Sequence, residues 1–339
     1  MNDPILVWGG GAIGGTMAAY WARAGLDVLI VDIEPEHVKA CRTEGLKITG
    51  PVEAFDVTVP ATVPDQLDGE FSRIVLAVKA QHTSRAVQTL APHLTETGCV
   101  VSAQNGLNER VISGVIGEER TVGAFVNFGA DWHSPGEILF GNRGAVVIGE
   151  LDGKRRQRTD DIYQLMQVFE PNAVLTDNIW GYLWGKLAYG AMLFATALNN
   201  DSMADNFADS LRAPVWIGLG REVMGLAHKR GVRPVGFNGF DPNAYAPQAS
   251  VDESARSIAE LAAFNRQSAK THSGIWRDLA VRKRKTEIDE QIGILSMLAR
   301  EVNMDVPLID RLVELIHDIE SGHREISPDT FSILLQRCG

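Results

Sequence analysis

The sequence predicts an α/β fold in the first half of the chain, with a mainly parallel, doubly wound sheet, followed by an all-helical second half. Three observations predict it. Short apolar runs alternate with amphipathic helical patterns up to about residue 177. A glycine-rich turn joins the first apolar run to the first helix, and strand patterns nearly vanish after residue 178. Buried strands that alternate with helices are typical of parallel sheets with crossover connections.

The first elements follow from these patterns in order. Apolar residues recur at helical spacing from residue 12 to residue 24, and Gly25 ends that helix. A second helical pattern surrounds residues 84–94. We expect buried strands at residues 5–9, 28–32, 73–79 and 99–104.

After residue 121 the spacing between elements shortens, which indicates an added sheet segment. Turn residues separate its strand-like runs, among them Pro135-Gly136 and Gly141-Asn142. We expect strands at residues 121–128, 137–140 and 145–150, a helix at 158–169 and a last strand near 174–176.

The second half reads as helices joined by loops. We expect helices at residues 179–198, 212–230, 252–263, 287–302 and 307–319, with a proline- and glycine-containing surface loop at 231–250. A chain of 339 residues is long for one core, so two domains are the natural expectation. We place a dinucleotide-binding domain at residues 1–177 and a substrate and catalytic domain at residues 178–339.

Composition excludes several classes of partner. The net charge of −11 disfavours nucleic acid and anionic membranes. The three cysteines are far apart and have no metal-ligand spacing, so neither a disulfide framework nor a zinc site is expected. We see no signal peptide and no apolar run long enough for a membrane span. A cytoplasmic enzyme acting on a small molecule fits best.

The glycine-rich turn predicts a dinucleotide site. Gly9, Gly11 and Gly14 form a GxGxxG pattern that follows a strand and opens a helix. The first glycine permits the turn, the second lets the backbone approach a pyrophosphate, and the third allows close packing of helix on strand. Ala12 and Ile13 lie in the first turn of the helix, whose N–H groups and dipole favour phosphate. These features predict a Rossmann-type domain.

Asp32 predicts which dinucleotide binds. It closes the second strand, where a carboxylate accepts hydrogen bonds from the adenosine ribose and repels a 2′-phosphate. No basic residue follows until Lys39. NAD(H) is therefore favoured over NADP(H), although Asp32 could also cap the following turn.

The chain also resembles the ketopantoate reductase (2-dehydropantoate 2-reductase) family from end to end. The motifs that carry the resemblance are, in order, GGGAIGG, VLAVKAQHT, SAQNGLNE, LWGKLAYGA and RKTEID. The resemblance implies a Rossmann domain joined to a helical domain, and reduction of a 2-oxo acid with NADPH in the cleft between them.

The resemblance also implies roles for individual residues. Lys79 matches a lysine that approaches nicotinamide and substrate, and Asn105 matches an asparagine near the nicotinamide ribose and substrate. Lys186 matches the catalytic lysine, and Glu287 matches a carboxylate that contacts the lysine and a substrate hydroxyl. Ser273 is the best match for the serine that binds the substrate carboxylate, although its spacing to Glu287 differs.

Two departures point away from ketopantoate itself. The family pattern has asparagines four and eight residues after the catalytic lysine, where this chain has Gly190 and Phe194. Those positions share a helix face with Lys186, so the predicted pocket wall becomes more apolar. Asp32 in turn replaces the basic or neutral residue expected for NADPH. We interpret the protein as a paralogue with another substrate and an NAD preference.

In this hypothesis Lys186 is the proton donor in reduction and the base in oxidation. As a base it needs a lowered pKa, which burial or the neighbouring cation of Lys79 would supply. Glu287 would orient Lys186, while Asn105 and Ser273 would hold polar groups of cofactor and substrate. Taken alone, Lys186 reads as a solvent-reaching side chain and Glu287 as a helix-terminal carboxylate; the ordered set of motifs favours catalysis.

Several alternatives stay open. His272 is a rival acid or base, Arg277 could hold a second carboxylate, and His82 could lie near the cofactor, whereas the basic run 282–285 reads as a solvated turn or helix face. The function could also be true 2-dehydropantoate reduction, a 3-hydroxy acid dehydrogenase, or a non-enzymatic NAD(H) sensor. The oligomeric state is also open; helical second domains of such enzymes often dimerise, and analogy suggests a homodimer.

Overall fold

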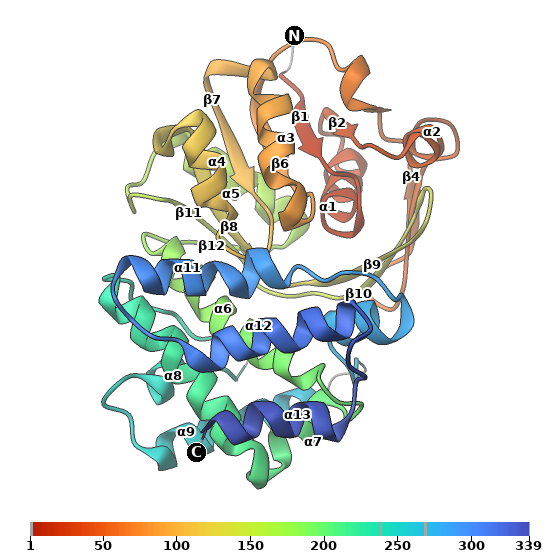
Figure 1. Ribbon diagram of the computed structural model, residues 1–339. Helices are drawn as coiled ribbons and strands as arrows, with labels where there is room; N and C mark the ends of the chain where they lie inside the picture. Colours follow the sequence, from red (N-terminus) through yellow and green to blue (C-terminus); the bar gives the residue numbers. More distant parts are fainter. Residues whose placement is uncertain (1–2, 238, 268–269, 339) are drawn as a thin grey trace. The chain divides into compact units, whose positions relative to one another are not determined.

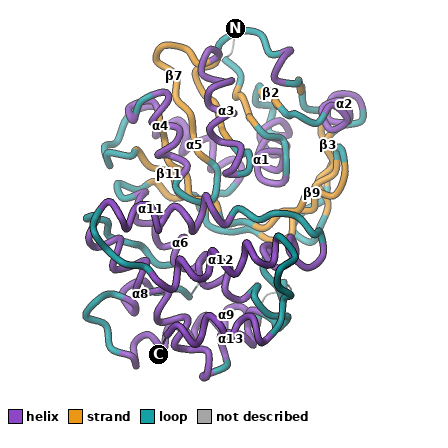
Figure 2. Tube along the Cα trace, in the orientation of Figure 1, coloured by secondary structure: helices purple, strands orange, loops and turns teal. Residues whose placement is uncertain are grey.

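The computed structural model describes residues 3–237, 239–267 and 270–338, and the chain divides into two compact units at Ile179 and Trp180. The division lies close to the expected boundary at residue 177. Strands are confined to the first unit, apart from an isolated bridge between Phe237 and Phe240, as far as the described residues show (Figure 2). The predicted fold class, a parallel α/β domain followed by a helical one, is confirmed.

The main sheet of the first unit has eight strands in the order β12-β11-β8-β7-β6-β1-β2-β5. Neighbouring strands run parallel except for β8 and β11. From β1 the chain adds strands first on one side and then on the other, so the winding reverses at β1 and β6. Ligands of open α/β sheets bind at the carboxyl ends of strands at such a point. The strands are β1 Ile5–Trp8, β2 Val28–Val31, β5 Ala61–Thr62, β6 Phe71–Leu76, β7 Leu94–Ser102, β8 Thr121–Val126, β11 Val146–Glu150 and β12 Val174–Leu175.

Helices cover both faces of this sheet (Figure 1). Alternate side chains of β1 enter opposite cores, because successive strand residues point to opposite faces. Val7 lies in an apolar cluster with Met17 of α1, and Leu6 lies in the other cluster with Val87 of α3 and Ile112 of α4. The helices are α1 Ala12–Arg23, α2 Pro35–Thr43 and α5 Gln157–Phe169 against the first cluster, and α3 Thr83–Leu90 and α4 Asn108–Ile116 against the second.

A second sheet of four strands, in the order β4-β3-β10-β9, packs against α1. The Tyr20 ring of α1 makes edge contacts with Phe55 of β4 and Phe140 of β10, at centroid distances of 5.2 and 5.9 Å. We expected only the strand at residues 137–140 here. The polar residues of β9 and the short, half-exposed β3 and β4 hid the other strands. Their bounds are β3 Leu46–Thr49, β4 Phe55–Val57, β9 Gly129–Ser134 and β10 Glu137–Asn142.

The second unit is built from helices. Among its described residues they are α6 Ile179–Thr196, α7 Met203–Ala208, α8 Ala213–Lys229, α9 Val251–Arg266, α10 Gly274–Trp276, α11 Ile294–Glu301, α12 Pro307–Glu320 and α13 Pro328–Leu335. The predicted helix at 287–302 is shorter than expected, because a π-helical turn, Asp289–Gly293, precedes α11. Helices α7, α10 and α13 were not predicted. No helix in the described part of the chain is long and apolar enough to cross a membrane.

Candidate active site

The glycine-rich turn has the geometry that a phosphate-binding loop needs. Gly9 has a φ of +101°, and a Cβ at Gly14 would collide with the Gly9 carbonyl oxygen. Both positions therefore require glycine. A Cβ at Gly11 would meet nothing within 4 Å, so the turn opens onto free space at this point. Gly11 is also the N-cap of α1 and offers no side chain to its first turn, in which Ala12 and Ile13 lie. The turn fits a pyrophosphate.

Asp32 lies at the carboxyl end of β2 and is bound to this turn. Its Oδ2 accepts a hydrogen bond from the Gly10 N–H at 2.7 Å, and its Oδ1 accepts one from the Glu34 N–H at 3.0 Å. The second bond confirms that Asp32 organises the following turn, and the first joins it to the glycine loop. Each carboxylate oxygen keeps a further lone pair for a ribose hydroxyl.

Lys79 and Asn105 lie at the same edge of the sheet. In register, Trp8 of β1 pairs with Leu76 of β6, and Leu76 pairs with Ser102 of β7. The predicted strand 73–79 ends earlier, at Leu76, so Lys79 occupies the turn beyond it. Asn105 is exposed in the turn after β7. The glycine turn, Lys79 and Asn105 thus follow the ends of three adjacent parallel strands.

A buried polar network that the sequence analysis missed supports these two turns. The Gln104 side-chain amide donates to the Val78 carbonyl at 2.8 Å and to the Thr83 hydroxyl at 2.7 Å. Thr83 donates to Asn108 Oδ1 at 2.8 Å, and Asn108 donates to the Asn105 carbonyl at 2.6 Å. Gln104 adjoins Asn105 in the AQNG motif, which was the available signal, whereas the role of Thr83 depends on partners far away in the sequence.

Lys186 lies on α6 in the second unit, and its side chain is partly buried. A Cβ at Gly190, one turn later, would meet nothing within 4 Å, so this position faces open space. Phe194 is only 1% exposed and belongs to the interior. On the helix face that carries Lys186, Gly190 therefore borders open space, whereas Phe194 packs into the interior.

Glu287 lies in the turn that precedes the π-helical turn Asp289–Gly293 and α11. The preceding residue fixes this turn, because Glu320 Oε1 of α12 accepts from both the N–H and the hydroxyl of Thr286, each at 2.7 Å. Gln291 donates to Glu287 Oε2 at 3.4 Å. Glu320 is thus a further residue that sequence analysis missed, and it holds the turn in place from another helix.

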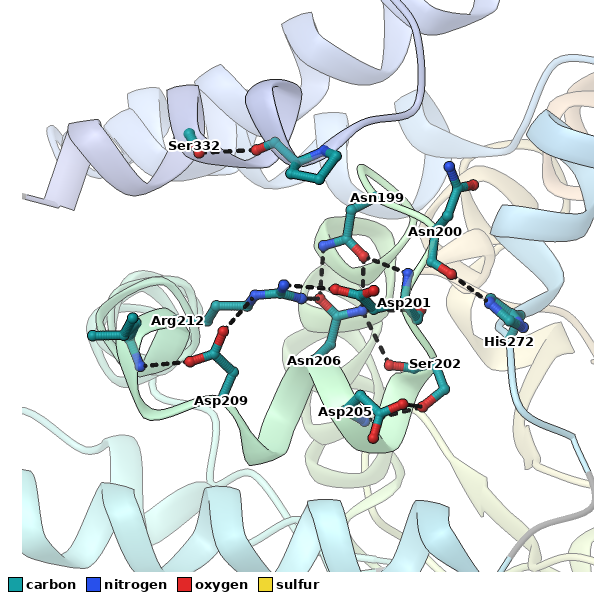
Figure 3. Close-up of polar contacts among 12 residues, drawn as sticks. Asn199, Asn200, Asp201, Ser202, Asp205, Asn206, Asp209, Arg212, His272 and Ser332 are labelled. Carbon is teal, nitrogen blue, oxygen red and sulfur yellow. Dashed lines mark hydrogen bonds and ion pairs between the residues drawn. The ribbon is translucent and has the colours of Figure 1, made fainter.

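The segment with Ser273 is bound to the turn that follows α6 (Figure 3). His272 Nε2 lies 3.1 Å from the Asn200 carbonyl oxygen, and the Trp276 indole donates to Asn200 Oδ1 at 3.1 Å. Ser273 is 3% exposed, and its hydroxyl accepts from the Trp276 N–H at 3.1 Å, which makes it the N-cap of α10. His272 and Ser273 thus have structural partners, and substrate contacts for them stay predictions.

The turn after α6 is itself a compact polar cluster. Asn199 and Asn206 exchange side-chain hydrogen bonds of 2.8 and 3.1 Å, and Arg212 binds Asn206 and Asp201 at 2.6 Å each (Figure 3). Asn200, which binds the segment with Ser273, lies within this turn. The basic run forms an exposed turn, as expected, in which Arg282 and Arg284 pair with Asp278.

Comparisons with known proteins identify the family of this chain. The model of the family "Ketopantoate reductase PanE/ApbA" matches residues 5–153, and that of its C-terminal domain matches residues 178–320. The chain therefore belongs to the ketopantoate reductase family. Among curated relatives, a 2-dehydropantoate 2-reductase of Pyrococcus abyssi is 26% identical over 90% of this chain and 93% of its own length.

Solved structures show the same fold. A ternary complex of D-mandelate dehydrogenase with NADH and anilino(oxo)acetate has a TM-score of 0.81 at 20% identity, covering 94% of this chain and 99% of the other. A ketopantoate reductase of the same family from Ralstonia eutropha JMP134 has a TM-score of 0.79 at 22% identity, covering 95% of this chain and 100% of the other. The fold of this family member is thus shared along nearly its whole length.

Proposed function

We propose that this family member is an NAD(H)-dependent oxidoreductase that transfers a hydride between nicotinamide and a 2-hydroxy or 2-oxo acid or a related alcohol. The observation that carries the proposal is the glycine turn at the switch point of the sheet. Gly11 faces open space there, and the Asp32 carboxylate is bound to the neighbouring Gly10. A pyrophosphate and an adenosine ribose need these two groups side by side.

The preference for NAD(H) over NADP(H) rests on charge around Asp32. Glu34 and Glu36 follow it on the exposed turn and the first turn of α2, and the first basic residue after them is Lys39. Three carboxylates on one short segment repel the 2′-phosphate of NADP(H), and Asp32 accepts the ribose hydroxyls of NAD(H).

The residues of this chain divide the chemistry between them. The bound nicotinamide supplies or takes up the hydride. We assign to Lys186 the proton of the substrate oxygen, which it donates in reduction and accepts in oxidation. Glu287 would orient the Lys186 ammonium. Lys79 and Asn105 would hold cofactor and substrate at the sheet edge, and we keep Ser273 as a candidate for the substrate carboxylate.

The substrate we propose is not ketopantoate but a larger or more apolar acid. The open space at Gly190, where the resemblance implies an asparagine, leaves room for substrate next to the Lys186 face of α6. A second candidate is reduction of ketopantoate itself, which the names of the curated relatives favour. A homodimer and a cytoplasmic location stay predictions.

A spectrophotometric screen tests the function. Purified protein is incubated with NAD or NADP and a panel of 2-hydroxy acids, and with NADH or NADPH and the matching 2-oxo acids, including ketopantoate. We expect turnover with NAD(H) and an acid bulkier than ketopantoate. Faster turnover of ketopantoate than of every other acid would favour the second candidate. No turnover together with no binding of either dinucleotide would refute the proposed function.

Replacement of the proposed proton donor separates an enzyme from an NAD(H) sensor. In Lys186→Ala we expect kcat to fall about 10²–10⁴-fold, because general acid–base catalysis contributes about that much, while the Kd for NADH stays within twofold. Lys229→Ala is the matched control, since Lys229 is an exposed lysine of the same unit. Unchanged kcat in Lys186→Ala would remove Lys186 from the mechanism.

A further inference from the structure

A histidine is buried directly beneath the glycine-rich turn. His37 of α2 is 1% exposed, and its two ring nitrogens have different partners. Nε2 lies 2.8 Å from the Gly10 carbonyl oxygen. Nδ1 lies 3.0 Å from the backbone nitrogen of Gly136, in the turn between β9 and β10 of the second sheet. The imidazole therefore connects the glycine-rich turn to the second sheet, which is separate from the main one.

These partners determine the tautomer of His37. The Gly136 N–H can only donate, so Nδ1 must accept and carries no proton. The proton is then on Nε2, which donates to the Gly10 carbonyl. The indole N–H of Trp132 on β9 also donates to Nδ1, at 3.5 Å, and the two rings lie at a centroid distance of 6.2 Å and an interplanar angle of 68°. The second sheet thus fixes both the position and the tautomer of the imidazole.

The contact with His37 also orients the peptide between Gly10 and Gly11 in the glycine-rich turn, because a peptide unit is planar. The Gly10 carbonyl and the Gly11 N–H belong to one planar unit and point in opposite directions. Because His37 holds the carbonyl inward, the Gly11 N–H is directed outward, at the residue where the loop opens onto free space. The Gly10 N–H is held by Asp32 at 2.7 Å. Both polar groups of Gly10 are therefore fixed by side chains.

We propose that His37 is a positioning residue for the dinucleotide pyrophosphate, and that the second sheet acts through it to pre-orient the glycine-rich turn. This inference rests on the proposed function. His37 acts only through Gly10, because its burial keeps it away from any ligand. Cys41 Sγ lies 3.7 Å from Nε2, and burial raises the pKa of this thiol to about 12, so the ring has a neutral neighbour there.

Three substitutions of His37 test separately its hydrogen bond to Gly10 and its hydrogen bond to Gly136. Glutamine places its amide nitrogen near the position of Nε2, so His37→Gln can still hold the Gly10 carbonyl. Asparagine places its amide oxygen near the position of Nδ1, so His37→Asn keeps the link to the second sheet, through Gly136 and Trp132, and loses the link to Gly10. His37→Leu removes both. His93→Leu is the control, because His93 of the same unit also bonds a backbone carbonyl, that of Gly69, at a turn outside the cofactor loop.

The readouts are Kd values for NADH and ADP-ribose by calorimetry, kcat where turnover is available, and thermal unfolding of each variant. We expect His37→Leu and His37→Asn to raise both Kd values about tenfold, the equivalent of one lost hydrogen bond. His37→Gln should recover most of the affinity. The kcat at saturating cofactor and the affinities of His93→Leu should stay within twofold of wild type.

The inference is tested by the order in which wild type and the His37 variants bind NADH and ADP-ribose. Equal affinity of wild type and His37→Leu, or equal affinity of His37→Gln and His37→Asn, would overturn it, because a purely structural histidine would change only the unfolding temperature. If His37→Leu does not fold, the comparison of the glutamine and asparagine variants still separates the two cases. Wild type that binds neither NADH nor ADP-ribose would instead refute the proposed function, and the inference with it.

Discussion

At the scale of single residues, hydroxyl and amide groups buried at the sheet edge orient the turns that carry Lys79 and Asn105. Thr83 is the central residue of this network, since its hydroxyl accepts from Gln104 and donates to Asn108. The residue is only 1% exposed. A buried polar group that loses its partner costs more than the bond itself contributes, because the group was removed from water. The network is therefore sensitive to the loss of one oxygen.

We expect Thr83→Val, which keeps the shape and removes the hydroxyl, to lower the free energy of unfolding by about 1–3 kcal/mol and to reduce kcat/KM. Denaturant unfolding and steady-state kinetics measure the two effects. Thr89→Val is the control on the same helix, because the exposed Thr89 hydroxyl bonds the Arg85 carbonyl of its own helix. The network would have no such role if both variants behaved alike.

The residues found from sequence are those whose signal is local. Gly9, Gly11 and Gly14 form a motif within six positions, and Asp32 ends the next strand, so their roles could be predicted without a structure. His37 and Thr83 could not, because their meaning depends on Gly136 and Asn108, which folding brings to them.

At the scale of elements, α8 and α12 are joined by a partly buried carboxylate. Glu222 of α8 accepts from the N–H groups of Leu308 and Ile309 at the start of α12, at 2.9 Å each. Burial raises the pKa of Glu222 from 4.5 to about 7, and it outweighs these two bonds, which lower it. The first turn of α12 thus depends on a group that titrates near neutral pH.

The sign of the pH effect follows from this raised pKa. Between pH 4.5 and about 7 the folded chain holds a proton on Glu222 that the unfolded chain has lost. The contribution of Glu222 to stability is therefore full below pH 4.5 and declines as pH rises to about 7. In Glu222→Gln this decline is absent.

We accordingly expect the unfolding temperature of wild type to exceed that of Glu222→Gln by less at high pH than at low pH. Thermal unfolding of both proteins on either side of the raised pKa measures the difference. Glu314→Gln is the control, since Glu314 is exposed on α12 and pairs with Arg311 at the surface. A gap that is constant or widens with pH would show that Glu222 does not titrate as described.

Element boundaries also show where local patterns fail. The predicted strand at 99–104 begins earlier, at Leu94, because the exposed residues of its first half look like a turn. The π-helical turn before α11 shortens the predicted helix and leaves Glu287 outside it. Where a strand or helix ends depends on its pairing with neighbouring strands and helices. The local sequence of one segment carries no information about these neighbours.

At the scale of the whole molecule, the cofactor should stabilise the folded chain by mass action. NADH at 100 times its Kd should add about 2.7 kcal/mol to the free energy of unfolding. If NADPH binds tenfold more weakly because of Asp32, the same concentration should add about 1.4 kcal/mol. Thermal shift with each dinucleotide tests this order. A larger shift with NADPH would contradict the proposed NAD preference.

The fold class, the position of the dinucleotide loop and the family could all be predicted from the order of the amino acids, because apolar periodicity and glycine spacing are recorded along the chain. Other features emerge only on folding: a second sheet packs on α1, His37 spans from that sheet to Gly10, and Glu320 and Asn200 fix the turns beside Glu287 and Ser273. These contacts join residues separated by up to about a hundred positions. Their partners become neighbours only when burial of the apolar faces brings the elements together.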